Sequence, residues 1–344
     1  MTSIFLEPLD VLYLRGNKLF ADAGSHGEAL MPPWPSLAAG AIRSRLMAEG
    51  ASLESLGTFQ LLQYGLARYH KADALEQLWP LPADVIVSDE LKLGDATYLC
   101  PTATPLGISS SYALPKLPTL QTDKPGKPVG GLWLNGEGIN TWLAGRALSA
   151  KHLVRSGELW QTDPRLGIAL DPATRSAADG KIYTTETITL KQGVGFHATY
   201  EGSTQQLPAE CLVRMGGDGR GAVVRFCVLP EVAPDWARIE KEGRFRLMLT
   251  TPGLFNGGWQ PDGVPATLIS ASVSRAETVS GWDLVTNKPK AAQRVAPTGS
   301  VYWFENFTGD VAVLKSLVQH GFPNADPARH AEGFGKLVIA PWAD

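Results

Sequence analysis

The sequence contains few of the residues that bind metals or form disulfides. Its 344 residues include three cysteines (Cys100, Cys211 and Cys227) and six histidines. No histidine lies in an HExxH arrangement or pairs with a cysteine at zinc spacing, so we expect no metal site and no cofactor. Widely spaced cysteines are typical of reduced thiols, so the expected location is the cytoplasm.

Long apolar runs and an excess of positive charge are also absent. No uninterrupted apolar stretch approaches the roughly 20 residues of a membrane helix, and the start, MTSIFLEPLD, lacks the basic region of a signal peptide. The net charge is −3, so any contact with RNA must depend on local basic patches rather than on an overall positive field. Hydrophobic residues make up 44% of the chain, which is typical of a globular protein, and 344 residues are enough for two domains.

The first half of the chain mixes predicted strands and helices. Residues 3–15 are typical of a strand, and PSLAAGAIRSRLMAEG (35–50) predicts a helix with proline in its first turn and glycine past its end. Three further helices are expected, near 53–70, 138–150 and 208–215. A hairpin is expected from 181–191 and 193–202, and an exposed loop at 114–131.

The second half is expected to start after Pro230 and Pro234. In RFRLMLTTP (244–252), Phe245, Leu247 and Leu249 alternate with Arg244, Arg246 and Met248. This period of two predicts a strand whose arginines lie on the unburied side, free to touch RNA or a partner subunit. Strands are also expected at 266–274 and 300–306, and a helix from Asp310, a natural N-cap, to Gly321.

Both halves suggest the order strand, helix, two strands, helix, strand. This order predicts an α+β fold of two ferredoxin-like domains in tandem. The predicted domains are residues 1–232, with an insertion at about 51–180, and residues 240–344.

A series of motifs then points to one family. In chain order they are FLEPLDVLYLRGNKLF, PPWPSLAAGAIRSRL, RLGIALDPATRSAADGKIYTTE, RMGGDGRGAVVRF, TPGLFNGGWQPDG, GWDLVTNKPKAAQRVAPTGSVYWFE and GFGKL. Together they resemble the third subunits of type III-B CRISPR (Cmr) effector complexes, members of the RAMP superfamily. The resemblance covers nearly the whole chain except about 51–155. It implies tandem ferredoxin-like domains and a non-catalytic subunit that binds the 5′ tag of the CRISPR RNA (crRNA). It also implies docking on the large palm-domain subunit and on a backbone RAMP subunit.

Ser36, Gly40 and Arg43 share one face of the predicted helix at 35–50. Ser36 is placed to cap the helix or to donate a hydrogen bond, and the helix N-terminus favours an anion. Glycine within a helix costs about 1 kcal/mol relative to alanine, which favours a close approach of RNA or protein backbone at Gly40. The alternative is that Gly40 packs against a strand while Arg43 is simply solvated.

RMGGDGRGAVVRF (214–226) raises the question of a metal site, because Gly-Gly-Asp occurs at metal sites of nucleotide cyclases and polymerases. Asp218 has no acidic neighbour in sequence, and the motif is expected between a helix and a strand rather than at a hairpin tip. We therefore interpret it as a turn in which Gly217 allows close backbone approach and Arg220 meets a phosphate. A helix cap with a solvated arginine is an equally open interpretation.

The other candidates for RNA contact lie in three predicted loops. They are Arg165, Arg175 and Lys181 in the first, Lys290 and Arg294 in the second, and Gly333, Gly335 and Lys336 before the last strand. The resemblance implies that the second loop lies near guide RNA or the large subunit, and that the third faces the RNA backbone. Phe334, in that third loop, is a candidate for base stacking.

Two other functions remain open. One is a metal-independent RAMP endoribonuclease that processes precursor crRNA, with His26 and Tyr13 as its catalytic candidates. The other is a protein-binding adaptor that makes no contact with RNA.

Overall fold

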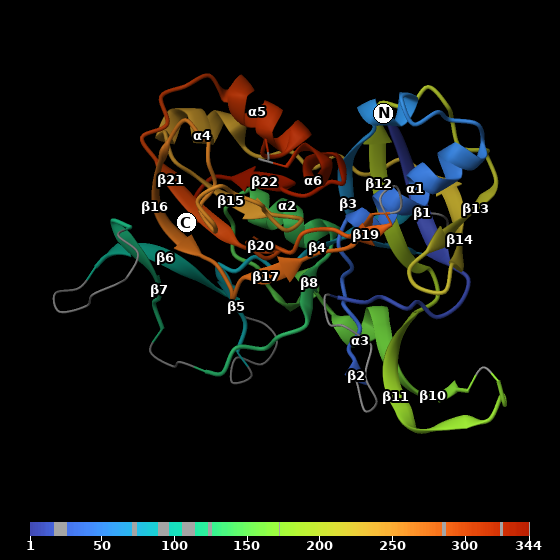
Figure 1. Cartoon of the computed structure of the whole chain (residues 1–344). Coiled ribbons are helices and arrows are strands. Elements are labelled where there is room, and N and C mark those ends of the chain that lie inside the picture. The colour runs from blue at the N-terminus through green and yellow to red at the C-terminus, as the bar shows by residue number, and fades with distance from the viewer. Residues whose placement is uncertain are drawn as a thin grey trace.

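The computed structural model describes residues 1–16, 26–70, 74–88, 96–104, 114–122, 126–171, 173–283, 287–323 and 326–343. It is a mixed α/β protein with many antiparallel strands and few helices, and two main sheets lie side by side (Figure 1). No helix in these ranges is both long and apolar enough to cross a bilayer.

The first main sheet is built from strands within residues 2–226. Its order is β13-β14-β1-β12-β3-β4-β8-β9, and every neighbouring pair is antiparallel. The bounds are β13 (Cys211–Met215), β14 (Arg220–Phe226), β1 (Thr2–Pro8), β12 (Val194–Glu201), β3 (Gln60–Tyr69), β4 (Leu75–Pro80), β8 (Leu132–Leu134) and β9 (Leu153–Arg155). Short helices α2 (Gly136–Leu143), α3 (Ser156–Leu159), η1 (Ser55–Thr58) and η2 (Ala150–His152) connect these strands.

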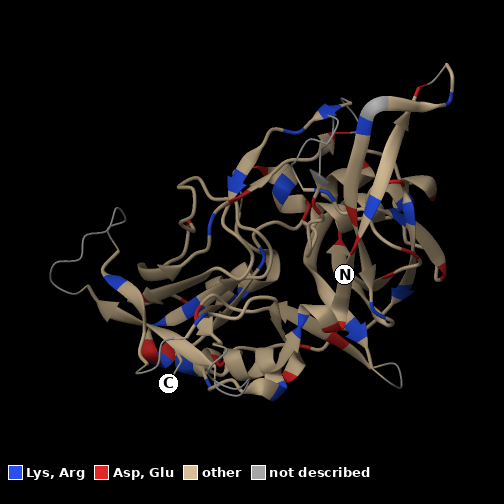
Figure 2. Cartoon of the chain, turned by 90° about the horizontal axis from the view of Figure 1, so that it is seen from below, with Lys and Arg blue, Asp and Glu red and all other residues tan. Residues whose placement is uncertain are grey.

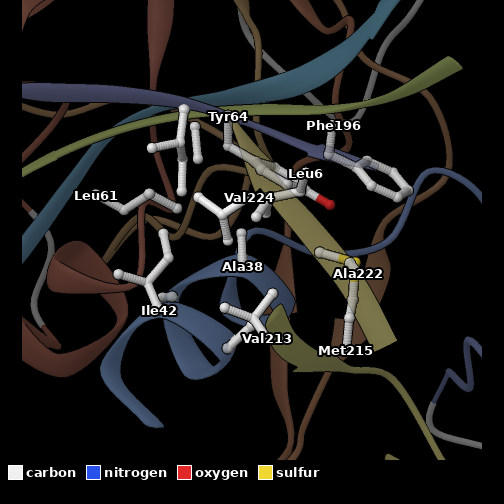
Figure 3. Close-up of a cluster of buried hydrophobic side chains, with 14 of the residues drawn as sticks. Leu6, Ala38, Ile42, Leu61, Tyr64, Phe196, Val213, Met215, Ala222 and Val224 are labelled. Carbon is white, nitrogen blue, oxygen red and sulfur yellow. The ribbon is translucent and has the colours of Figure 1, made fainter. Parts of the chain in front are cut away.

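Helix α1 (Ser36–Ala48) covers one face of this sheet and confirms the helix expected at 35–50. Ala38 and Ile42 are fully buried and point toward Val213 and Val224 on the sheet (Figure 3). Gly50, at φ 98°, follows the helix end, as the sequence indicates. Shortening Ile42 to alanine within this packed layer is expected to cost about 2–5 kcal/mol.

Three sequence-based expectations for the first main sheet and the strands next to it are wrong. Residues 53–70 form η1 and β3 rather than a helix, and residues 211–215 form β13 where a helix was expected over 208–215. In β13, buried Cys211, Val213 and Met215 alternate with exposed Leu212 and Arg214, which is the pattern of a strand. The strands at 181–191 and 193–202 do not form a hairpin, because β12 pairs with β1 and β3 while the preceding strand belongs to another sheet.

That other sheet is a projecting arm. Strands β10 (Trp160–Leu170) and β11 (Ala177–Leu190) form a long antiparallel ribbon, and β2 (His26–Gly27) pairs in parallel with β11 at its base. The arm extends away from both main sheets (Figure 1). Leu166, Ile168, Leu170 and Ile182 are exposed along it.

The second main sheet is built from residues 245–340 in the order β16-β21-β15-β22, again antiparallel throughout. The bounds are β16 (Thr267–Ser272), β21 (Val301–Glu305), β15 (Phe245–Leu249) and β22 (Leu337–Ala340). The other elements of this half are α4 (Trp236–Glu242), α5 (Val311–His320), α6 (Pro327–Ala331), β17 (Glu277–Val279), β18 (Trp282–Asp283), β19 (Lys288–Pro289) and β20 (Gln293–Val295). Helix α5 confirms the helix expected after Asp310, whose carboxylate accepts a hydrogen bond from the Ala312 N–H at 2.7 Å.

The segment predicted as an insertion joins both sheets. Strands β3, β4, β8 and β9 extend the first sheet, and β5 (Val85–Ile86), β6 (Thr97–Ala103) and β7 (Lys116–Leu120) form a separate three-stranded sheet. Trp79, Val85 and Trp142 share one hydrophobic cluster with Met248 and Trp303 of the second main sheet. Residues 116–120, expected in an exposed loop, form strand β7, which pairs with β6 and is half-buried.

Candidate nucleic-acid interface

The Gly-Gly-Asp turn lies at the tip of the β13–β14 hairpin, so the expected helix before it is wrong. Gly216, Asp218 and Gly219 have φ values of 76°, 58° and 60°. Glycine adopts this left-handed region at little cost, and Asp is among the few other residues enriched there. The N–H of Gly217 donates to the Tyr13 carbonyl at 2.8 Å, and a Cβ at position 217 would lie 3.1 Å from the Tyr13 Cβ. Gly217 thus allows a close backbone approach, and the approaching backbone is the protein's own.

Tyr13 organises the first of two basic clusters. The guanidinium of Arg220 lies 5.3 Å from the centre of the Tyr13 ring and forms an ion pair with Asp10 at 2.8 Å. Arg165, from β10, pairs with Asp163 at 3.1 Å. The pKa of Arg165 is raised by its hydrogen bond to Asp163 and, to a smaller degree, by its contact with Tyr13. Tyr13, Arg165, Gly217 and Arg220 are called the Tyr13 cluster below.

Glu332 organises the second basic cluster. Its buried carboxylate accepts hydrogen bonds from Lys290 and from Arg329, the latter at 3.0 Å. Arg329 also donates to the side chain of Gln293 at 2.9 Å and to the Ser280 carbonyl at 3.2 Å. These bonds hold the β17–β20 ribbon against α6.

Arg43 of α1 completes this second cluster. Its guanidinium lies 4.6 Å from the centre of the Phe59 ring. Burial lowers the pKa of Arg43, while the negative charge of Glu332 acts in the opposite direction. Lys290 and Arg329 therefore share one carboxylate, whose negative charge also acts on Arg43, and we call Arg43, Lys290, Arg329 and Glu332 the Glu332 cluster. The sequence patterns did not single out Arg329 or Glu332 as site residues, although an acidic residue directly before a glycine-rich loop was a usable signal.

The open side of α1 lies next to Arg43. Gly40 is exposed, and a Cβ at this position would meet nothing within 4 Å. The interpretation that Gly40 packs against a strand is therefore wrong, and room remains for another chain. Ser36 is the first helical residue; Pro35 occupies the N-cap, and no side chain caps this end, so the capping role expected for Ser36 is also wrong.

The loop before the last strand faces the interior. A Cβ at Gly333 would lie 3.0 Å from Leu61, and Phe334 is fully buried against Val279 and Val295. Gly335 has a φ of 76°, and its N–H donates to the Pro252 carbonyl at 2.9 Å. These contacts give both glycines a packing role in place of the expected contact with RNA. A stacking role for Phe334 is also wrong.

Lys336 is buried as well. Its ammonium donates to the His320 carbonyl at 2.6 Å, and burial lowers the pKa of Lys336 to about 8. A phosphate contact through this ammonium is therefore contradicted. Arg246, expected on an unburied strand face, is likewise fully buried and pairs with Asp84.

The remaining basic candidates are exposed. Arg175 and Lys181 lie on the arm, and Arg294 lies on β20. Figure 2 shows Lys and Arg distributed over the fold and interspersed with Asp and Glu rather than gathered in a single patch. RNA contact is therefore expected to depend on a few defined groups.

Metal-ligating residues do not gather in the part of the chain that the structure describes: no group of three or more His, Cys, Asp or Glu side chains is placed to share a cation. Asp218 is exposed at its hairpin tip. Of the two ribonuclease candidates, Tyr13 contacts Arg220, while the side chain of His26 lies outside the described residues.

Comparison with known families settles the resemblance. The family model described as CRISPR-associated protein (Cas_Cmr3) matches residues 4–342. The chain belongs to the Cas_Cmr3 family. As a Cmr3-type protein it is a component of a type III-B Cmr effector complex. A comparison with curated proteins finds no match.

Two solved structures have a similar fold. Both are cryo-EM structures of the type III-B Cmr-beta assembly with cognate target RNA, one of them also with AMPPnP. In each, the matching chain is 13% identical, and the match covers 98% of this chain and 96% of that one. The TM-scores are 0.56 with AMPPnP and 0.54 without it. At 13% identity, the similarity to these two structures concerns only the fold of this chain.

Proposed function

We propose that the protein is a non-catalytic subunit that holds the 5′ tag of crRNA within the effector complex. One geometric observation carries the proposal: Arg165 of the arm and Arg220 of the β13–β14 hairpin both contact Tyr13, and each pairs with a partly exposed carboxylate, Asp163 or Asp10. Guanidinium groups at a partly exposed surface suit a sugar–phosphate chain. Arg43, on the same helix face as the exposed Gly40, and the exposed Arg175, Lys181 and Arg294 extend the contact.

The proposal includes two ferredoxin-like domains in tandem, residues 1–232 and 240–344. The sheet order β14-β1-β12-β3 in the first half and β22-β15-β21-β16 in the second supports it. In each case the first strand of the unit lies between the fourth and the third, which a βαββαβ unit produces. Helix α1 follows the first strand of one unit, and α5 precedes the last strand of the other.

The protein is also proposed to dock on the large palm-domain subunit and on a backbone RAMP subunit. The arm supports contact with a partner subunit, because Leu166, Ile168 and Leu170 alternate along β10 and are all exposed. Apolar side chains that share one exposed face are typical of contact surfaces.

RNA titration against the reconstituted complex tests the tag assignment. Changing Arg43, Arg220 and Arg294 together to glutamine is expected to weaken tag binding and to lower its dependence on salt. For single-stranded RNA, each phosphate contact makes the slope of log affinity against log salt steeper by about 0.7, so the loss of contacts makes the slope shallower. A matched triple change of Arg155, Arg225 and Arg244 removes the same charge elsewhere. Equal slopes for the two triple variants would contradict the assignment and favour a protein-binding adaptor.

A further inference from the structure

A cavity of about 510 Å³ lies between the first main sheet and the second half of the chain. Strands β1, β3, β4 and β12 form one wall. Residues 227–232, which link the two halves, and residues 250–252 and 336–338 form the others. The volume lies within the range of roughly 300–1,000 Å³ of small-molecule sites.

The sheet wall of this cavity is polar without being charged. Ser3, Gln77, His197 and Thr199 line it from neighbouring strands, and they alternate along those strands with core residues such as Ile4 and Ala198. Gln77, His197 and Thr199 are all more than nine-tenths buried. The Thr199 and Ser3 hydroxyls share a hydrogen bond at 2.9 Å, so the unpaired atom among these four side chains, in the described part of the chain, is Nδ1 of His197. A buried polar group without a partner costs about 1–3 kcal/mol, so stability alone favours an apolar side chain at that position.

His197 lacks a full set of partners. Within the described residues its Nδ1 has no hydrogen-bond partner, and its Nε2 is 3.5 Å from the Gln77 amide nitrogen. The ring reaches across Gly65, where a Cβ would come within 2.8 Å of Nε2. Burial lowers the pKa of His197 to about 3, so at neutral pH the ring is uncharged and offers one donor and one acceptor.

The remaining lining indicates the shape of the ligand. Trp79, Trp133 and Pro33 supply flat apolar surfaces, and the indole N–H of Trp79 is also unpaired among the described residues. Glu231 and Lys336 are the charged side chains of the lining, and the Lys336 ammonium is bonded to the His320 carbonyl. This combination disfavours a phosphate and suits a neutral, planar molecule with donors and acceptors along its edge.

We infer that this cavity binds one nucleobase, with the base edge toward Gln77, His197 and Thr199. Nucleobases are recognised by hydrogen bonds along an edge and by flat apolar contacts on a face. The base belongs either to a free nucleoside or to an unstacked nucleotide of bound RNA. The inference favours the RNA source, and to that extent it rests on the proposed function.

Two measurements separate these sources. In the first, adenosine, guanosine, cytidine and uridine are titrated into the purified full chain by calorimetry. In the second, the reconstituted complex carries crRNA with one 4-thiouridine or 6-thioguanosine at each tag position in turn, and crosslinked peptides are sequenced. A crosslink in β3, β4 or β12 supports the RNA source, and nucleoside binding by the chain alone supports the free one.

Gln77→Leu and Thr199→Val keep the size of the side chain and remove its hydrogen bonds. Each is expected to weaken the base contact about tenfold, the effect of losing roughly 1.4 kcal/mol of hydrogen bonding. Gln206→Leu makes the same chemical change at an exposed position outside the cavity. Melting temperatures confirm that each variant folds.

Three outcomes overturn the inference: no nucleoside binds while tag crosslinks fall elsewhere on the chain, no crosslink reaches the chain at all, or Gln77→Leu behaves like Gln206→Leu. In the first case the proposed function survives and the cavity assignment fails. In the second case the proposed function fails as well.

Discussion

The buried ion pair between Asp84 and Arg246 supports a sharp prediction about stability. Both side chains are almost completely buried. Asp84 also accepts a hydrogen bond from the Trp142 indole at 3.1 Å, and Arg246 donates to the Trp142 carbonyl at 2.9 Å. The guanidinium lies 4.3 Å from the Trp142 ring centre and 4.7 Å from that of Tyr98. The pair thus joins the segment around residues 84–142 to β15.

The Arg246→Met change removes one partner and leaves the Asp84 carboxylate buried without a counter-charge. Breaking a buried pair in this way costs about 3–5 kcal/mol, whereas replacing both partners by apolar residues is often neutral. The double change Arg246→Met with Asp84→Leu leaves the Trp142 indole unpaired, which costs about 1–3 kcal/mol. The double variant should therefore be more stable than the single one.

The pH dependence has a defined sign. Burial raises the pKa of Asp84 against the opposing effect of Arg246, and without Arg246 that opposing effect is lost. A carboxyl group with a raised folded-state pKa destabilises the fold as pH rises through that pKa. The loss of unfolding free energy caused by Arg246→Met should therefore be larger at pH 8 than at pH 5.

Urea unfolding followed by circular dichroism and tryptophan fluorescence measures these differences. Arg244→Met is the matched control, because the Arg244 side chain is partly exposed and pairs with Glu242, and a solvent-accessible ion pair contributes about 0–1 kcal/mol. If Arg246→Met costs no more than Arg244→Met, or if the double variant is the least stable of the set, the reasoning about this pair is refuted.

Three further predictions concern single positions. Gly40→Ala should raise the free energy of unfolding by about 1 kcal/mol, because the site is exposed with open space, and should weaken tag RNA binding by the complex; calorimetric melting and titration measure the two effects. His197→Gln should reduce the loss of stability between pH 6.5 and pH 3. The pKa of His197 is about 3 in the folded protein, so the unfolded chain binds a proton at this residue before the folded protein does, and stability is lost as the pH falls through this range. Urea midpoints measured across the range check the prediction. Asp310→Ala should cost about 1 kcal/mol through its lost cap, with Asp310→Asn as the control that retains the cap, both measured by urea unfolding.

The sequence correctly predicted the helices whose first and last turns are determined by nearby capping residues. Helices α1 and α5 follow Pro35 and Asp310 and end near glycines, and each end depends on residues within a few positions. Strand β3 was missed because Leu61 and Leu62 are adjacent and both buried, Leu61 in the core beneath α1 and Leu62 on the side of the cavity. Burial on both sides erases the period of two, and the run then resembles a helix.

The sequence predicted that glycines and arginines belong to the site, but it could not predict which residues they contact. Gly217 was expected to permit a close approach, and it does, yet its partner Tyr13 is about 200 residues away in the chain. Glu332 acts on Arg43 and Asp84 pairs with Arg246, and in both cases the two residues are far apart in the sequence. From sequence alone, an arginine in a strand pattern is expected to be solvated, because the segment that packs against it is not known. The sequence therefore could not distinguish the buried Arg246 from the partly exposed Arg244.

The pairing also gives the two basic clusters different roles in the proposed function. Arg165 and Arg220 pair with Asp163 and Asp10, which are both substantially exposed. Such surface pairs contribute little, so a phosphate can replace either carboxylate at low cost. In the Glu332 cluster the carboxylate is buried, and withdrawing Lys290 or Arg329 from it would leave an uncompensated charge. The Tyr13 cluster is therefore suited to exchange its partners for RNA, while the Glu332 cluster fixes the ribbon and α6 beside Arg43 and the open face of α1.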